Sequence, residues 1–137
     1  MNRELALAAV VTLLAVVLYI FMAMRVGMLR GLHKIPAPAM LGHPQFERAS
    51  RVHLNTGEQM ISFLPLLWLA SLLFHGLYWL PAAFGFCFVL ARLLYLRLYM
   101  GAPDSRVAGA FLTIIPQVGL FVLAVIGLVQ AWPAIWS

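Results

Sequence analysis

The stretch "FERASRVHLNTGEQMISFLPLLWLASLLF", residues 46–74, decides the fold because it joins a polar half to an apolar half. The uncharged run within it, residues 60–74, would span only about 22 Å as a helix, at 1.5 Å of rise per residue. A helix that crosses the hydrocarbon core of a bilayer, roughly 30 Å thick, needs about 20 residues. The sequence therefore predicts a membrane-spanning helix that begins near Phe46 and carries part of the polar half to membrane depth.

Composition predicts that the rest of the chain lies in the membrane as well. The chain has 137 residues, of which 64% are hydrophobic and 9% are charged, whereas about a quarter of the residues of a soluble domain are charged. Three further apolar runs predict three more spanning helices. The expected fold is a single all-α membrane domain, residues 1–137, with a four-transmembrane-helix bundle. The expected spans are residues 5–30, 46–74, 77–100 and 105–131.

The distribution of Lys and Arg predicts the orientation of the bundle. Basic residues flank the link between the first two spans and the link between the last two, whereas "HGLYWLP" (75–81) and the C-terminal residues have none. Positive residues concentrate in cytoplasmic loops, so both basic links are predicted to face the cytoplasm and both termini the opposite side. The net charge of +5 is then explained by anionic lipid headgroups, and no nucleic-acid partner is expected.

Polar side chains gather at the predicted cytoplasmic ends of the helices. Their spacing places two sets each on one helical face: Arg48, Arg51, Asn55 and Glu58 on the second span, and Arg92, Tyr95 and Tyr99 on the third. Ionisable groups at membrane depth are costly, so they should face the bundle interior and either pair with one another or bind a ligand. In the first interpretation, Glu58 neutralises Arg92 or Arg51.

The charge balance at these helix ends favours a ligand. Six arginines meet three carboxylates there: Arg30, Arg48, Arg51, Arg92, Arg97 and Arg106 against Glu47, Glu58 and Asp104. Because unpaired buried charge is unfavourable by several kcal/mol, an anionic ligand with more than one acid group is expected. It should also carry a cationic group, since Glu58 lies two turns deeper than Arg51. Glutathione has this combination, with two carboxylates, one ammonium and a thiol.

The segments "FERASRVHLNTGE" (46–58), "ARLLYLRLY" (91–99) and "DSRVAG" (104–109) resemble a known family, the membrane-associated proteins in eicosanoid and glutathione metabolism. The resemblance covers essentially the whole chain. It implies a homotrimer that binds its co-substrate glutathione between neighbouring subunits. It implies a catalytic Arg106 that holds the thiolate, and glutathione contacts from Arg30, Arg51, His53, Asn55, Glu58, Arg92, Tyr95 and Tyr99. Gln59 departs from the leukotriene C synthase branch, which has an aromatic ligand contact there.

A guanidinium group at Arg106 would have a definite chemical effect. A free thiol has a pKa of about 8.5 and is mostly protonated at neutral pH. A fixed positive charge in a partly dry site favours the thiolate, and lowering the pKa by about two units requires roughly 2.7 kcal/mol. The expected function is therefore a membrane-embedded glutathione transferase that attacks lipophilic electrophiles from the bilayer. Glutathione-dependent peroxidase activity is left open.

Two other functions stay open at this point. One is a non-catalytic lipid-binding member of the same family, which the intact set of Arg51, Asn55, Glu58 and Arg106 disfavours. The other is a small transporter in which Glu58 relays a proton or a cation. Tyr19, Phe111 and Ile115 could line the access path of the electrophile, although core or lipid contact is favoured for each.

The remaining histidines and the cysteine carry weaker signals. His33, His43 and His75 are interpreted as solvated loop residues, and no metal site is expected because no second ligand stands at a suitable spacing. Cys87 has no partner for an internal disulfide. It is interpreted as a small apolar side chain that faces lipid or a neighbouring helix.

Overall fold

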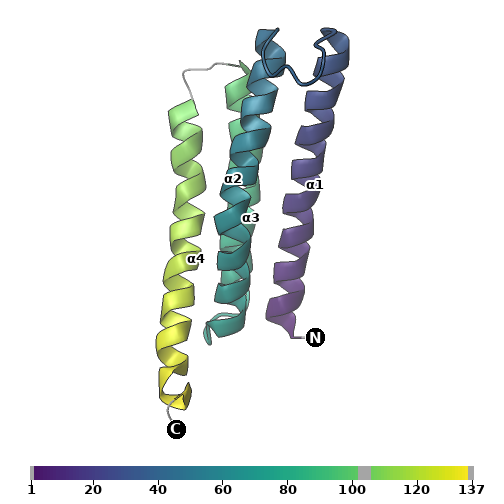
Figure 1. Cartoon of the computed structure of the whole chain (residues 1–137). Coiled ribbons are helices and arrows are strands. Elements are labelled where there is room, and N and C mark those ends of the chain that lie inside the picture. The colour runs from purple at the N-terminus through teal and green to yellow at the C-terminus, as the bar shows by residue number, and fades with distance from the viewer. Residues whose placement is uncertain (1, 102–105, 136–137) are drawn as a thin grey trace.

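Four long helices make up the structure, a computed structural model that describes residues 2–101 and 106–135, except for the side chains of residues 106–110 and 133–135. The helices are α1 (Arg3–Leu32), α2 (Pro44–Leu73), α3 (Leu80–Gly101) and α4 (Arg106–Ile135). They form a bundle in which the N-terminal and C-terminal ends of the chain lie at the same end (Figure 1). Each helix contains a segment long and apolar enough to cross a membrane. The predicted four-helix fold is confirmed.

The beginning of α2 confirms that the polar half of residues 46–74 is helical. His43 caps the helix, since its side chain accepts a hydrogen bond from the backbone N–H of Gln45, and Pro44 occupies the first turn, where its missing N–H costs nothing. By contrast, α3 begins at Leu80, three residues later than expected. The Leu80 N–H donates to the Leu77 carbonyl in a turn, so the link from α2 is longer than the sequence suggested.

The two middle helices, α2 and α3, form the centre of the bundle. Each contacts the other three helices, whereas α1 and α4 do not touch within the described residues. The stacked rings of Phe63 and Phe88, with centroids 3.8 Å apart, fill the space between α2 and α3. Near the chain termini, a Cβ atom added to Gly127 would lie 2.4 Å from the carbonyl carbon of Leu73. Glycine is therefore what allows α4 to contact the last turn of α2.

A polar cluster connects α2 to α4 near the middle of both helices. Gln117 donates from Nε2 to the side-chain oxygen of Gln59, and its own Oε1 accepts from Ser62 at 2.7 Å. Side-chain hydrogen bonds of this kind stabilise helix contacts in membranes. Gln59, the position that departs from the leukotriene C synthase branch, is thus used for packing of α4 in this chain.

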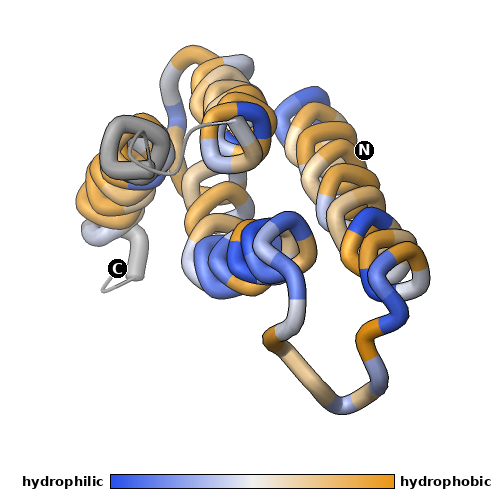
Figure 2. The backbone as a smooth tube through the Cα atoms, turned by 90° about the horizontal axis from the view of Figure 1, so that it is seen from above, coloured by the Kyte–Doolittle hydropathy of each residue, from blue (hydrophilic) through white to orange (hydrophobic). Residues whose placement is uncertain are grey.

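The outer surface of the bundle is apolar. Large side chains such as Leu13, Ile61 and Phe111 are 65%, 77% and 65% exposed, and Cys87 lies on this surface as well. Exposure of so extensive an apolar surface to water is unfavourable, so lipid or other helices must cover it. Seen along the bundle, hydrophilic residues gather instead at the beginning of α2 and near the end of α1, whereas much of the link between them is pale to orange (Figure 2).

The link between α1 and α2 is held close to the bundle. Arg30, in the last turn of α1, donates to the carbonyl of Ala39 at 2.8 Å and lies over the ring of Phe46. The rings of His33 and His43 stack with centroids 3.4 Å apart. These histidines, interpreted as solvated loop residues, do lie in the link at partly exposed positions. Their contact, which the sequence did not predict, brings the two ends of the link together.

Candidate functional site

Five of the predicted site residues line one groove between α2 and α3. We refer to it as the α2–α3 groove, and its lining residues are Arg51, Leu54, Asn55, Glu58, Tyr95 and Tyr99. Its volume is about 370 Å³, and it opens to the outside of the chain. These five residues share one face of each helix as the spacing predicted, whereas Arg48 and Arg92, which were expected on the same faces, do not line this groove. Leu54 is the one lining residue that sequence reasoning missed.

The groove holds opposite charges at its two ends. Arg51 and Glu58 are seven residues apart on α2, which corresponds to a rise of about 10 Å. Neither forms an ion pair with another residue in the described part of the chain. Their separation along the helix leaves both groups free to meet a ligand that carries a negative group near Arg51 and a positive group near Glu58.

Arg92 lies beneath the groove rather than in it. Its side chain is 1% exposed, and its Nη2 atom donates to the hydroxyl of Thr56 at 2.6 Å and to the Oδ1 atom of Asn55 at 3.1 Å. Its Nε atom also donates to Thr56, and its guanidinium lies over the ring of Tyr95. The suggested pairing of Glu58 with Arg92 is therefore wrong, because Arg92 uses neutral acceptors on α2.

The contact with Arg92 fixes the orientation of the Asn55 amide. A guanidinium group has donors only, so the Asn55 oxygen must face Arg92. Because Asn55 also lines the groove, we infer that its amide nitrogen, which has two N–H donors, is the atom that faces a ligand there. The sequence suggested that Asn55 presents both a donor and an acceptor to a ligand. In the structure its oxygen accepts from Arg92, so the N–H donors are what remains for the ligand.

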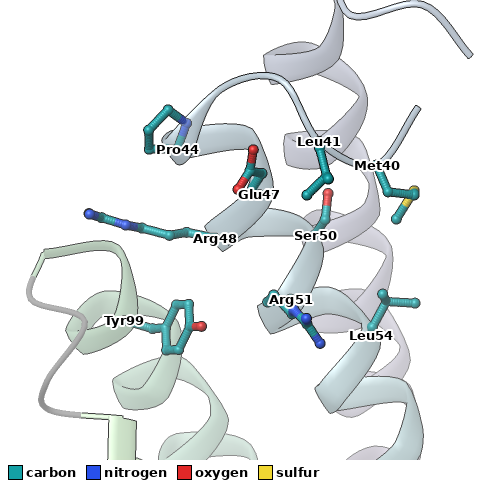
Figure 3. A pocket seen from close by; sticks show the side chains of 9 residues that line it. All are labelled: Met40, Leu41, Pro44, Glu47, Arg48, Ser50, Arg51, Leu54 and Tyr99. Carbon is teal, nitrogen blue, oxygen red and sulfur yellow. The ribbon is translucent and has the colours of Figure 1, made fainter.

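A second hollow adjoins the groove at the end nearest the α1–α2 link. It shares Arg51, Leu54 and Tyr99 with the α2–α3 groove and has a volume of about 460 Å³. Tyr99 of α3 reaches toward the α2 side chains, with Arg48 above it (Figure 3). The other lining residues are Met40, Leu41, Pro44, Glu47, Arg48 and Ser50. The two hollows together make a continuous depression with arginines at its outer end.

Two predicted contacts besides Arg92 lie outside the groove. Arg30 holds the α1–α2 link, where its Nη1 atom donates to the carbonyls of Pro36 and Ala39. His53 faces α1, stacks on Tyr19 with ring centroids 4.4 Å apart, and has a buried Nε2 atom without a hydrogen-bond partner in the described residues. A single chain therefore does not bring these two side chains to the groove, and their contacts with glutathione stay predictions.

The remaining predicted residues divide into two groups. Arg106 is the first residue of α4, but its side chain lies outside the described residues, so the predicted catalytic role stays a prediction. Phe111 and Ile115 are exposed on α4 at 65% and 64%, which agrees with lipid or substrate contact. Among the described residues, no group of three or more His, Cys, Asp and Glu side chains could hold a metal ion.

Comparison with known proteins gives consistent matches along the chain. The profile of the MAPEG family matches residues 8–126. The chain is 34% identical to leukotriene C4 synthase of Bos taurus over 128 residues, which cover 93% of this chain and 84% of that protein. It is 35% identical to microsomal glutathione S-transferase 2 of Mus musculus over 127 residues, which cover 93% and 85%. With four helices of spanning length, these matches identify an integral, multi-pass membrane protein.

Proposed function

Because the chain belongs to the MAPEG family, we propose that it is a membrane-embedded glutathione transferase that acts on lipophilic electrophiles. The observation that carries this proposal is the α2–α3 groove, which presents Arg51 and Glu58, both without an ion pair among the described residues, on either side of the Asn55 amide. Relatives whose names state glutathione transfer and leukotriene C4 synthesis support the same class of reaction.

Glutathione fits the groove by charge and by hydrogen bonding. Arg51 binds a carboxylate, since a guanidinium fork matches the two carboxylate oxygens. Glu58 binds the ammonium group, and the Asn55 N–H donors bind a carbonyl or carboxylate oxygen between them. Tyr95 and Tyr99 border the opposite wall on α3. Arg92 acts as a positioning residue, because it holds Asn55 in the donor orientation without facing the groove.

Arg106 is proposed to supply the chemical step. It opens α4, which begins at the same end of the bundle as α2 (Figure 1), and the arginines of the depression lie near the beginning of α2. Its positive charge favours the glutathione thiolate, and the thiol proton passes to water. The thiolate sulfur then forms a bond to the electrophilic carbon. A halide departs with its electron pair, or an epoxide opens and its oxygen takes up a proton.

The complete site is proposed to form between subunits of a homotrimer. Arg30 and His53 lie away from the groove of their own chain, so a neighbouring chain would have to provide them. The site is proposed to face the cytoplasm, because the basic link between α1 and α2 lies at its outer end. Glutathione would then come from the aqueous side and the electrophile from the bilayer.

The test is a glutathione-dependent activity screen of detergent-purified protein with aryl halides, hydroperoxides and epoxide lipids. Arg106→Ala should bind glutathione as the wild type does but lack the ultraviolet absorbance of the thiolate near pH 7, whereas Arg106→Lys should retain part of it. Glutathione binding without turnover on any of the three substrate classes would indicate a non-catalytic member instead. No glutathione binding at all would refute the proposal.

A further inference from the structure

Two arginines that the glutathione site does not use line a separate hollow between α1 and α3. The hollow has a volume of about 490 Å³, and its lining residues are Phe21, Arg25, Leu93, Leu96, Arg97 and Met100. A second hollow on α1 continues from Phe21 and Arg25 toward the end of that helix. Arg97 stands two residues from both Tyr95 and Tyr99, about 200° around the helix. The hollow therefore lies on the face of α3 that points away from the α2–α3 groove.

The charge of this hollow is unbalanced. Among the described residues, its lining contains two guanidinium groups and no carboxylate. The Nε atom of Arg25 is buried and has no hydrogen-bond partner within residues 2–101 and the described part of α4. A buried donor without an acceptor is unfavourable, and two unneutralised positive charges beside each other make it more so. An anion with several acceptor oxygens would satisfy both arginines.

The depth of the two arginines indicates where that anion comes from. Arg25 lies seven residues before the end of α1 and Arg97 four residues before the end of α3, which correspond to about 10 Å and 6 Å along the helices. In a helix that spans a bilayer, this depth is where lipid headgroups meet the hydrocarbon core. A phosphate group at this level would be held by the lipid to which it belongs.

The surface below the arginines is suited to an acyl chain. On α1, Phe21, Val17 and Leu14 continue from Arg25 at helical spacing and are 48%, 63% and 40% exposed. On α3, Leu93 and Leu90 continue in the same direction and are also exposed. A soluble anion would leave this apolar strip bare, whereas a phospholipid covers it while its phosphate meets the arginines.

We propose that Arg25 and Arg97 bind the phosphate of an anionic phospholipid in the hollow between α1 and α3. Guanidinium groups suit phosphate because they donate two parallel hydrogen bonds, and basic pockets between membrane helices bind anionic headgroups in this way. The inference does not depend on the proposed glutathione chemistry, because the two sites share no residue and lie on opposite faces of α3.

The experiment measures phospholipid binding by the detergent-purified, full-length protein. Phosphatidylglycerol and phosphatidylcholine with the same acyl chains are titrated separately and bound lipid is counted by native mass spectrometry. The wild type should prefer phosphatidylglycerol. Arg25→Gln and Arg97→Gln should each weaken its binding about fivefold, and the double variant about 25-fold, as expected for the loss of about 1 kcal/mol per arginine.

Matched variants separate the site from general charge. Lys34→Gln removes the same charge from the exposed α1–α2 link at the same end of the bundle, and it should leave lipid binding unchanged. Arg25→Lys keeps the charge without the fork and should lose less affinity than Arg25→Gln. Glutathione titration and circular dichroism of the same samples should match the wild type, which shows that the variants are folded.

Four outcomes would overturn the inference. Equal binding of the two lipids would remove the role of headgroup charge. If millimolar inorganic phosphate protected the protein against thermal unfolding as effectively as phosphatidylglycerol does, the hollow would be a site for a free anion. If the double variant still preferred phosphatidylglycerol to phosphatidylcholine, residues other than Arg25 and Arg97 would cause the preference. A double variant that changes the oligomeric mass instead of lipid binding would show that a second copy of the chain covers this face.

Discussion

The orientation of the Asn55 amide leads to a prediction that separates the effect of the shape of this side chain from the effect of its N–H donors. Asn55→Asp keeps the shape of the side chain but replaces its two N–H donors with a second acceptor oxygen. The oxygen that faces Arg92 at 3.1 Å is retained and becomes charged, which strengthens that hydrogen bond. The thermal stability of the protein should therefore be equal to or higher than that of the wild type.

Glutathione affinity should change in the opposite direction. The variant loses a hydrogen bond to a charged group of the ligand, worth about 1.5–3 kcal/mol, which corresponds to a 10- to 150-fold increase in the dissociation constant. Repulsion between the new carboxylate and the glutathione carboxylates adds to this loss. Asn55→Ala should lose a similar affinity but also stability, because the Nη2 atom of Arg92 keeps only its bond to Thr56.

Isothermal titration with glutathione, paired with thermal unfolding of the same samples, measures both effects. If Asn55 instead presented its oxygen to the ligand ammonium, Asn55→Asp would bind glutathione at least as tightly as the wild type. That result would refute the assigned orientation, and with it the positioning role of Arg92. Equal losses of stability in the Asp and Ala variants would show that the contact with Arg92 does not hold the amide.

Three further predictions concern the ligand charge, the subunit arrangement and the helix contact. Glu58→Gln should weaken glutathione binding by about 1.5–3 kcal/mol in calorimetry, and a constant within twofold of the wild type would discard the contact with the ammonium. Arg30→Ala and Arg51→Ala should each be nearly inactive as homotrimers. In trimers that mix the two variants at random, about a quarter of the sites should contain both arginines and regain activity. No regained activity in co-expressed protein purified through two different tags would contradict a shared site. Gly127→Leu should lower thermal stability by about 1–3 kcal/mol, because its Cβ would meet the α2 backbone. Gly27→Ala, where a Cβ meets nothing within 4 Å, is the control, and equal unfolding temperatures would refute the close contact.

Periodicity along the sequence located the groove because a helix turns side chains in a known direction. Arg51, Asn55 and Glu58 share a face by spacing alone, and the charge at that face required a ligand or a partner. The same spacing argument also places His53, two residues after Arg51, on the far side of α2. The resemblance to a known family included His53 among the contacts, and the structure shows why one chain cannot supply it.

How deeply a side chain is buried, and which hydrogen-bond partner it meets, could not be predicted from the spacing of residues along the sequence. Arg92 shares the direction of Tyr95, but the sequence did not indicate that Thr56 would offer a buried hydroxyl to it. The conformation of a link that contains proline and glycine has no periodic signal, so the contact of Arg30 with Ala39 was also missed. These features depend on how the four helices pack, which local sequence does not determine.

Among the described residues, the walls of the α2–α3 groove come from a single antiparallel hairpin of the chain, residues 51–99, and α1 contributes no lining side chain. Most described positions of the two outer helices can therefore change without altering the walls of the groove, whereas a change at a lining position of the hairpin alters the groove directly. Arg30 on α1 and Arg106 on α4 are the exceptions, because the proposed site between subunits uses both. Chimaeras that exchange α4 between relatives should inherit substrate choice from the donor of α4 and glutathione affinity from the donor of the hairpin.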